Sequence, residues 1–437
     1  MSAENGLAKV ALLALAVACA GCRDRLRADD ADVVPGKYIV SIEAVDGEEF
    51  SLTDPKFRAR ARALRDQLVS ETIRGGGEVP FRYDNVLIGF SAAMSDQLAR
   101  TIDGREGVRV AKAHRVRLAA TQSDPPYGLD RIAERAGCLN RTYAYSQTGK
   151  GVHVYVIDTG IFSQHPEFQV APGQSRVSPD VYNPFNDGKQ DDDGHGTHVA
   201  GTIGGNTFGV AKDVELHSVR VFKRGIETDT GILIEAVDWV TENAKPHRPR
   251  VVVNMSLVSG RDEDLDRAVR RSIAQGLTYV VAAGNLDARF TDANACNVSP
   301  ARVRQAITVG ATHPGDDSIP HFSFAGGCLD TFAPGVYIMS ARNDLSGQPR
   351  IMSGTSMAAA HVSGLAALYL ETTVGKPPVM ASPPEVWKAV VKASSVHPGT
   401  SGWSGIKGSL RQSPNRLSHW GSMSQDGTTD GEVCPAT

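Results

Sequence analysis

Between residues 150 and 391, short apolar runs alternate with stretches of helical periodicity. The apolar runs cover residues 152–157, 215–221, 251–256, 278–283 and 306–311. The helical stretches cover residues 198–204, 230–244, 265–275, 356–370 and 384–391. Strands that are apolar throughout are typical of a parallel sheet covered by helices on both faces. The pattern therefore predicts an α/β domain with its functional groups at the carboxyl ends of the strands.

Three stretches of this region carry residues suited to nucleophilic catalysis. Asp158 follows the run 152–157, His195 lies in Asp-Gly-His-Gly-Thr-His, and Ser356 lies in Gly-Thr-Ser-Met before a run of alanines. A serine at a helix N-terminus lies near unpaired N–H groups and the positive end of the helix dipole, which suits a nucleophile that generates an oxyanion. Its hydroxyl needs an adjacent base, for which His195 is the candidate, with Asp158 to orient the ring. An N-cap serine is the simpler alternative for Ser356 taken alone.

The chain order Asp, His, Ser is that of subtilisin. The three motifs resemble those of the subtilisin-like serine peptidases, most of all the proteinase K and aqualysin branch, over roughly residues 121–417. The resemblance implies an α/β fold with a subtilisin-like parallel sheet and a triad of Asp158, His195 and Ser356. It also implies that the side chain of Asn285, at the end of an apolar run, donates to the oxyanion.

The second histidine of the His195 motif, His198, competes for the role of base. In the matching family motif the first histidine is catalytic and the second is structural. We expect the same here, and we expect His361 to be structural as well.

By the same resemblance, two segments form the edges of the substrate cleft. Ser256, Leu257 and Val258 form one edge, and Ile226 and Glu227 lie on the other. Relatives usually carry glycine near the position of Val258, so a valine side chain crowds the rim. Backbone pairing with an extended peptide tolerates this change. We therefore expect the first specificity pocket to prefer small or aliphatic side chains.

A structural calcium ion is the only cofactor that the resemblance implies, and none is needed for catalysis. Asp330, with the backbone carbonyls of Arg304 and Ala306, matches a calcium site of similar enzymes. Oxygen ligands suit this hard cation. A structural carboxylate that caps backbone amides is the alternative for Asp330. The sequence contains no histidine–cysteine cluster that indicates zinc.

Cysteines similar to those of aqualysin-type relatives predict a disulfide between Cys296 and Cys328, and leave Cys138 and Cys434 as a second candidate pair. A further cysteine pair of these relatives corresponds to Asp192 and Arg224. We expect an ion pair between these two side chains; two unrelated surface charges are the alternative.

Residues 1–34 have the features of an export signal and a tether. An apolar run over residues 10–18 precedes Cys19-Ala20-Gly21-Cys22, which is typical of a secretion signal rather than of a membrane helix. The end of this signal, residues 1–22, resembles a bacterial lipoprotein processing site with Cys22 as the lipidated residue. Residues 23–34 are charged and form the tether.

Residues 35–118 show a β-α-β-β-α-β pattern, which predicts a small α+β domain of ferredoxin type. It resembles the inhibitory propeptide of subtilisin-like enzymes; a generic small binding domain is the alternative. Residues 119–130 read as an exposed processing linker, cleaved beside Ala119 or Ala120. The peptidase domain then spans residues 131–419, and residues 420–437 form a tail.

The net charge of −3 and the absence of an aromatic and basic stripe argue against a nucleic-acid partner. We therefore expect a monomeric serine endopeptidase, exported from a bacterial cell, either secreted after processing or lipid-anchored, that contacts the membrane only through its lipid. Its partners are polypeptide substrates and its own propeptide in cis, which keeps the precursor inhibited. A catalytically inactive subtilisin-fold scaffold that only binds peptides is the alternative.

Overall fold

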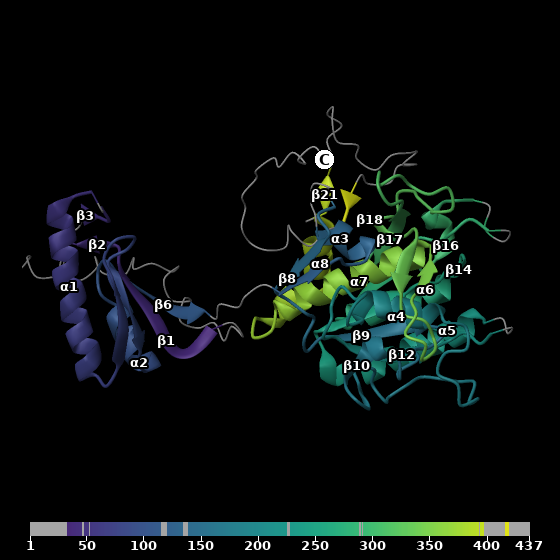
Figure 1. Ribbon diagram of the computed structural model, residues 1–437, viewed down its shortest axis with the longest axis horizontal. Helices are drawn as coiled ribbons and strands as arrows, with labels where there is room; N and C mark the ends of the chain where they lie inside the picture. Colours follow the sequence, from purple (N-terminus) through teal and green to yellow (C-terminus); the bar gives the residue numbers. More distant parts are fainter. Residues whose placement is uncertain are drawn as a thin grey trace, which may run out of the picture. The chain divides into compact units, whose positions relative to one another are not determined.

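The chain divides into two compact units, residues 1–117 and residues 118–437 (Figure 1). The computed structural model describes residues 33–45, 48–51, 53–114, 120–133, 139–224, 228–287, 290, 292–392, 394–396 and 416–418. The predicted signal, lipidation site, C-terminal tail and second cysteine pair (Cys138 and Cys434) lie outside these ranges. Among the described helices, none is long and apolar enough to cross a membrane.

The N-terminal unit is a four-stranded antiparallel sheet with two helices. Its strands are β1 (Val33–Ile42), β4 (Glu78–Tyr83), β5 (Gly89–Ala93) and β6 (Val108–His114), in the order β4-β5-β1-β6. A short hairpin, β2 (Ala44–Val45) and β3 (Glu48–Glu49), follows β1. The helices are α1 (Pro55–Arg74), capped by Asp54, and α2 (Asp96–Asp103), capped by Ser95. The first and last long strands are neighbours, so the predicted split β-α-β arrangement is present.

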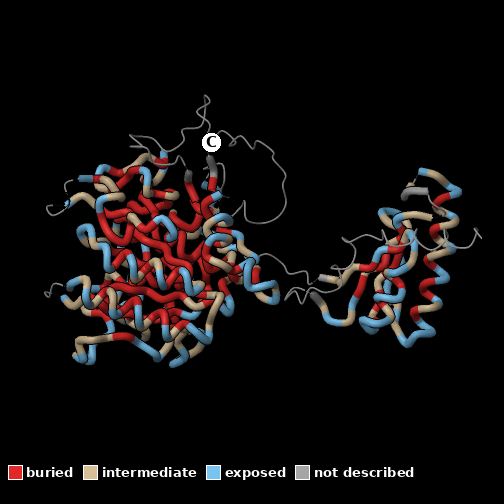
Figure 2. The backbone as a smooth tube through the Cα atoms, turned by 180° about the vertical axis from the view of Figure 1, so that it is seen from behind, coloured by how far each residue is buried: buried red, intermediate tan, exposed pale blue. Residues whose placement is uncertain are grey.

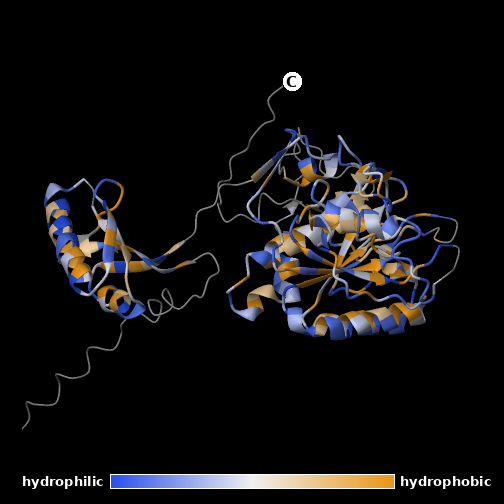
Figure 3. Cartoon of the chain, turned by 60° about the horizontal axis from the view of Figure 1, so that its bottom comes forward, coloured by the Kyte–Doolittle hydropathy of each residue, from blue (hydrophilic) through white to orange (hydrophobic). Residues whose placement is uncertain are grey.

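The second unit is built on a sheet in the order β12-β9-β13-β15-β17-β18-β22-β21. All neighbouring strands are parallel except the last pair. The strands are β9 (His153–Asp158), β12 (Glu215–Arg220), β13 (Val251–Met255), β15 (Thr278–Ala282), β17 (Ile307–Thr312), β18 (Thr331–Pro334), β21 (Ser395–Val396) and β22 (Arg416–Leu417). Their apolar residues stand out in Figure 3 at the centre of this unit. The five predicted strands are therefore present, within two residues at each end.

Helices cover both faces of this sheet. Val154 and Val156 of β9 pack in one core with α4 (His195–Gly204) and α7 (Thr355–Glu371). Tyr155 and Ile157 face the opposite core, with α5 (Thr230–Asn243) and α6 (Glu263–Ala274). The alternation along one strand thus fills two cores, as a doubly covered sheet requires. Helix α7 is buried along almost its whole length (Figure 2), and α8 (Pro383–Trp387) follows it.

The region expected to be an exposed linker, residues 119–130, is largely part of the second unit. Residues Ala120–Ser123 form β7, which pairs with β8 (Thr142–Tyr145). Helix α3 (Tyr127–Ala133) follows and buries Leu129 completely. Residues 120–123 are extended and mostly exposed, but their pairing with β8 and the burial of α3 make residues 120–130 part of the second unit rather than a free linker.

Several short elements complete the second unit. They are β10 (Gln169–Ala171), β11 (Gln174–Ser175), β14 (Ser259–Gly260), β16 (Val298–Ser299), β19 (Ile338–Ser340), β20 (Arg350–Met352), the 3-10 turns η1 (Pro166–Phe168), η2 (Lys245–His247), η3 (Ala295–Asn297) and η4 (Pro378–Ala381), and a π turn, η5 (Lys388–Lys392).

Candidate active site

The candidate site residues meet at the carboxyl edge of the central sheet. Strand β9 ends at Asp158, Ser256 follows β13, and Asn285 follows β15. At the same edge, α4 begins at His195 and Ser356 is the second residue of α7. The topology thus brings five residues from five elements to one place, as parallel sheets do with their functional groups.

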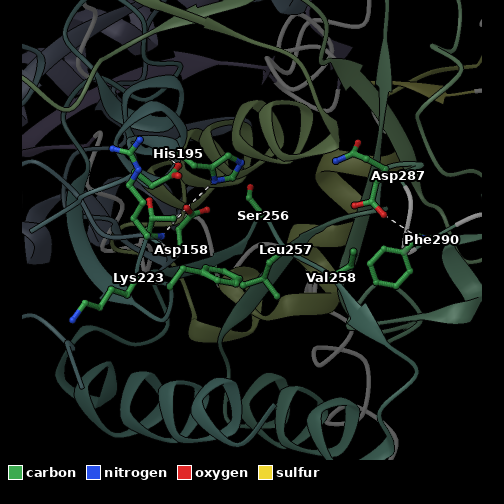
Figure 4. A pocket seen from close by; sticks show the side chains of 13 residues that line it. Asp158, His195, Lys223, Ser256, Leu257, Val258, Asp287 and Phe290 are labelled. Atoms are coloured by element: carbon green, nitrogen blue, oxygen red, sulfur yellow. Dashed lines mark hydrogen bonds and ion pairs between the residues drawn. The ribbon is translucent and has the colours of Figure 1, made fainter. Parts of the chain in front are cut away.

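Asp158 and His195 form a hydrogen-bonded pair. The Nδ1 atom of His195 lies 2.7 Å from Oδ1 of Asp158, which is 1% exposed and also accepts the backbone N–H of Thr159 (Figure 4). Burial lowers the pKa of His195, but the charges of Asp158, Asp193 and Asp191 outweigh burial and raise it above its usual value. The pair therefore favours a charged imidazolium, as a general base requires after it has taken a proton.

The loop before α4 is held by the buried carboxylate of Asp191. One oxygen accepts from the backbone N–H groups of Asp193 and Gly194 and from the hydroxyl of Thr159. The other oxygen accepts from the N–H and hydroxyl of Thr197. Asp191 therefore fixes the first turn of the helix that carries His195.

Close backbone packing also restricts this turn. A Cβ atom added to Gly196 would lie 2.2 Å from the carbonyl oxygen of Gly160 and 3.1 Å from Cβ of Asp158. Only glycine fits at position 196, which explains the residue after His195 in the motif.

The hydroxyl of Ser356 donates to the carbonyl of Ser256 at 3.1 Å. It does not cap the helix, and within the described ranges no hydrogen bond joins it to His195. A buried chain of polar contacts fixes this segment. Ser363 Oγ donates to Asn254, Asn254 Nδ2 donates to Ser256 Oγ, and Ser256 Oγ donates to the Ser356 carbonyl.

The side chain of Asn285 is oriented by the residue before Ser356. Its Oδ1 atom accepts from the N–H (3.0 Å) and the hydroxyl (3.1 Å) of Thr355. Because both contacts go to Oδ1, the Nδ2 group of Asn285 faces away from Thr355 and can donate to another acceptor. A Cβ atom built on Gly354 would lie 3.5 Å from Asn285 Nδ2 and 3.7 Å from the backbone N of Ser356. Both nitrogens therefore lie within 4 Å of one point next to Gly354.

A cleft of about 420 Å³ adjoins these groups. Figure 4 shows Asp158 and His195 at one end, Val258 and Phe290 at the other, and Ser256 and Leu257 between them. Residues 256–258 join β13 to β14 and belong to neither strand. The predicted edge residues Ser256, Leu257 and Val258 therefore line the cleft, whereas Ile226 and Glu227 lie outside the described residues.

The model of the subtilase family matches residues 149–415. The chain belongs to this family. An extracellular serine proteinase of Thermus sp. (strain Rt41A) is 42% identical over 354 residues, which cover 78% of this chain and 81% of that protein. The alkaline serine exoprotease A of Vibrio alginolyticus is 40% identical over 321 residues, 72% of this chain and 56% of that protein. A crystal structure of a cold adapted subtilisin-like serine proteinase is 41% identical, with a TM-score of 0.57, and covers 68% of this chain and 98% of that chain. The chain is thus a subtilisin-like serine peptidase.

Two further histidines of this subtilase have structural environments. His198 donates from Nε2 to the carbonyls of Ile338 and Arg350, and burial lowers its pKa to about 4. His361 donates from Nδ1 to the carbonyl of Met357, and burial lowers its pKa to about 4 as well. Both rings are neutral donors within the fold, in line with the structural role expected for them.

Three residues of the subtilase site were missed from the sequence: Asp191, Asn254 and Thr355. Asp191 is the first of three consecutive aspartates, and only its burial distinguishes it from the other two. Asn254 and Thr355 lie inside motifs but act through partners about 70 to 110 residues away in the chain. The sequence carries no signal that singles out Asp191, because a capping acid is expected directly before a helix, and that position, 194, is glycine.

Asp330, the proposed calcium ligand, accepts the Thr308 N–H at Oδ2 (2.9 Å) and the Trp387 indole N–H at Oδ1 (3.1 Å). Arg304 and Ala306 immediately precede β17, beside β18. The two N–H donors are those expected of an amide cap, and the calcium role of Asp330 stays a prediction.

The disulfide predicted between Cys296 and Cys328 is present, with a Cα–Cα distance of 5.3 Å. The ion pair predicted between Asp192 and Arg224 is not formed. Asp192 Oδ1 instead lies 3.0 Å from the guanidinium of Arg220 and accepts the backbone N–H of Arg224. The side chain of Arg220 is 1% exposed, so it needs a carboxylate more than the exposed Arg224 does.

Proposed function

We propose that this subtilase hydrolyses peptide bonds through an acyl-enzyme, with Ser356 as nucleophile, His195 as general base and Asp158 as its orienting acid. The observation that supports this most is that Asn285 Nδ2 and the backbone N of Ser356 both lie within 4 Å of one point, where a Cβ atom on Gly354 would be. Such a pair of donors suits the oxygen of a tetrahedral intermediate. A scaffold that only binds peptides has no need of it.

The reaction begins when the Ser356 hydroxyl breaks its hydrogen bond to the Ser256 carbonyl and donates instead to Nε2 of His195. Catalytic hydrogen bonds often form only in the substrate complex. His195 then takes the hydroxyl proton as Oγ attacks the scissile carbonyl, and the oxyanion accepts from Asn285 and from the Ser356 N–H. His195 returns the proton to the leaving amine, and a water molecule repeats the sequence on the acyl-enzyme.

A fluorophosphonate distinguishes the active peptidase from the inactive scaffold. We expect the protein to gain one phosphonyl group, and peptide mapping to locate it at Ser356. The Ser356→Ala variant should gain none. Failure of the folded, processed protein to react would favour the scaffold and contradict the proposed mechanism.

We further propose that the substrate pairs with residues 256–258 as an added strand and that Val258 narrows the first pocket. Val258 is half-buried and packs against a hydrophobic core, as does Phe290 at the same end of the cleft. A peptide-library profile should show small or aliphatic residues before the cleaved bond, and Val258→Gly should broaden it. A profile dominated by Lys, Arg or Trp would contradict this.

The N-terminal unit is proposed to be an inhibitory propeptide, and the first 22 residues an export signal, lipidated at Cys22. The unit has its own buried core and precedes the peptidase, as an intramolecular inhibitor would. The precursor would be exported from a bacterial cell and released, or held at the envelope by its lipid. Mass spectrometry of the cell-envelope fraction would detect a diacylglyceryl group on Cys22.

Calcium is proposed as a structural ion at Asp330 with the carbonyls of Arg304 and Ala306. We expect EDTA to shorten the half-life of activity at elevated temperature and added calcium to restore it. Asp330→Asn should remove this dependence. If the variant responds to EDTA as the parent does, Asp330 is an amide cap and not a ligand.

A further inference from the structure

Three histidines that lie far apart in the chain meet at the amino edge of the central sheet. His153 opens β9, His217 lies in β12, and His247 ends η2. One ring nitrogen from each lies within 4.8 Å of the others. The pairing of β9 with β12 aligns His153 with Glu215 and Tyr155 with His217, so these side chains lie on one face of the sheet.

The carboxylate of Glu215, a fourth candidate ligand, lies beside these histidines. Nδ1 of His153 and Nε2 of His217 are 3.0 Å apart. One oxygen of Glu215 lies 3.7 Å from that Nδ1, and the other lies 3.7 Å from that Nε2. The carboxylate therefore spans the two nitrogens that face each other, and it is half exposed, which leaves an entry path from solvent.

We propose that His153, His217, His247 and Glu215 form a zinc site. Imidazole nitrogens with one carboxylate are a ligand set that zinc accepts in tetrahedral geometry, whereas calcium prefers oxygen alone. Nitrogens bound to one zinc ion are about 3.3 Å apart, given Zn–N distances of about 2.0–2.1 Å. The closest pair, at 3.0 Å, already has nearly this spacing, and the widest pair, at up to 4.8 Å, must close by up to about 1.5 Å.

The packing around the rings fixes His217 but not His247. The ring of His217 stacks on Tyr155 at 4.2 Å. The rings of His153 and His247 stack at 3.7 Å with planes 23° apart, so His247 must turn before both rings can direct a nitrogen at one ion. Arg250, a nearby cation, donates to the carbonyl of Gly151. Within the described residues, Nδ1 of His217 is buried and has no acceptor. A hydrogen-bond acceptor on the second ring nitrogen of a ligating histidine raises metal affinity by about 10- to 100-fold. Because His217 lacks one among the residues described, we expect a micromolar rather than a nanomolar affinity for zinc.

The proposed site is separate from the peptidase centre. Asp158 ends the same strand that His153 begins, so the two sites lie at opposite edges of the sheet, about 17 Å apart along β9. Zinc would tie the starts of β9 and β12 to η2, the turn that leads into β13. Its expected effect is therefore on stability, with no group of the triad involved.

The test uses the full chain with Ser356→Ala, to prevent self-digestion, in saturating calcium. Zinc bound at equilibrium is counted per chain by dialysis against buffer of known free zinc concentration, and its affinity is measured by competition with a chromophoric chelator. We expect one zinc with a Kd on the order of micromolar and a rise in Tm of about 5 °C at hundredfold excess. Cobalt should give the intense visible absorption of a tetrahedral ion.

His247→Gln and Glu215→Gln, each added to Ser356→Ala, test the ligands, and His321→Gln is the matched control on an exposed histidine outside the cluster. We expect His247→Gln to lose the bound zinc and the Tm rise, Glu215→Gln to weaken binding at least tenfold, and the control to retain both. Circular dichroism without metal identifies a variant that fails to fold, and the other variant then decides. Equal zinc content in all three, or none in the parent at 100 µM zinc, would overturn the proposal.

Discussion

The hydroxyl of Thr355 helps to set the orientation of the Asn285 amide. Its oxygen accepts the N–H of Gly284 at 3.2 Å and donates to Oδ1 of Asn285 at 3.1 Å. Because the hydroxyl proton is thereby directed at Asn285, the asparagine must present its oxygen to Thr355 and its NH₂ group to the cleft.

We predict that Thr355→Val lowers kcat about tenfold and changes KM little. The valine removes the hydroxyl contact to Asn285 Oδ1 and leaves only the backbone N–H contact, and the oxyanion forms only in the transition state. Thr355→Ser keeps the hydroxyl and should restore most of the rate. Equal losses in the two variants would show that side-chain packing, and not the hydrogen bond, matters at this position.

The pH dependence of catalysis follows from the raised pKa of His195. A higher pKa means that the ring loses its proton only at higher pH, so kcat/KM should rise through an apparent pKa above 6.5. Asp158→Asn removes the charge that contributes most to raising the pKa of His195. The acid limb of the kcat/KM profile should therefore move to lower pH. The substitution should also reduce kcat by up to about 10⁴, as in the serine-protease template.

Asp193→Asn provides the matched control for this measurement. Asp193 contributes charge but makes no contact with the imidazole, so its variant should show a smaller downward shift with kcat nearly unchanged. An acid limb at or below 6.5 in the parent enzyme would contradict the assignment of His195 as the titrating base.

At the scale of elements, the Cys296–Cys328 disulfide joins η3 to the segment before β18. Its loop of 32 residues is worth about 3.7 kcal/mol in the chain-entropy model. We predict that replacing both cysteines by serine shortens the half-life at elevated temperature and leaves kcat/KM at 25 °C unchanged. Half-life is the appropriate measure because peptidases unfold irreversibly. An unchanged half-life would mean that this loop opens after the rate-limiting step.

The elements that could be predicted from the sequence are those whose signal is local. The strands β9, β13 and β15 are apolar runs buried on both faces, and helices α5 and α6 keep a regular period, so their bounds were nearly right. Strand β7 was missed because Ala120–Ser123 carries no apolar pattern and exists only through β8.

The same distinction applies to the sites. Asp158, His195 and Ser356 lie in motifs that can be read one at a time, and the fold then brings them to one edge. The histidine cluster has no such motif, because 64 residues separate His153 from His217 and the sheet register alone unites them. The sequence therefore indicated no zinc ligands, and the structure was needed to find them.

At the scale of the whole molecule, each unit has its own buried core, the smaller around Tyr38, Phe57 and Phe90. Such a unit can fold and be removed without unfolding the peptidase, which the proposed role of propeptide requires. We predict that Ser356→Ala, expressed alone, accumulates as an uncleaved precursor, whereas the parent chain is cut near residues 119–120. Normal processing of this variant in a protease-free preparation would show that another enzyme makes the cut.

The pairing of β7 with β8 has a consequence for that cut. Residues 120–123 have four partners in β8, so a chain that newly begins at Ala120 starts inside a ladder of hydrogen bonds. A terminus left at Ala120 by the proposed cut would be held by this pairing, and β7 would have to leave β8 before that end could be rejoined. The pairing would therefore make the proposed cleavage effectively irreversible.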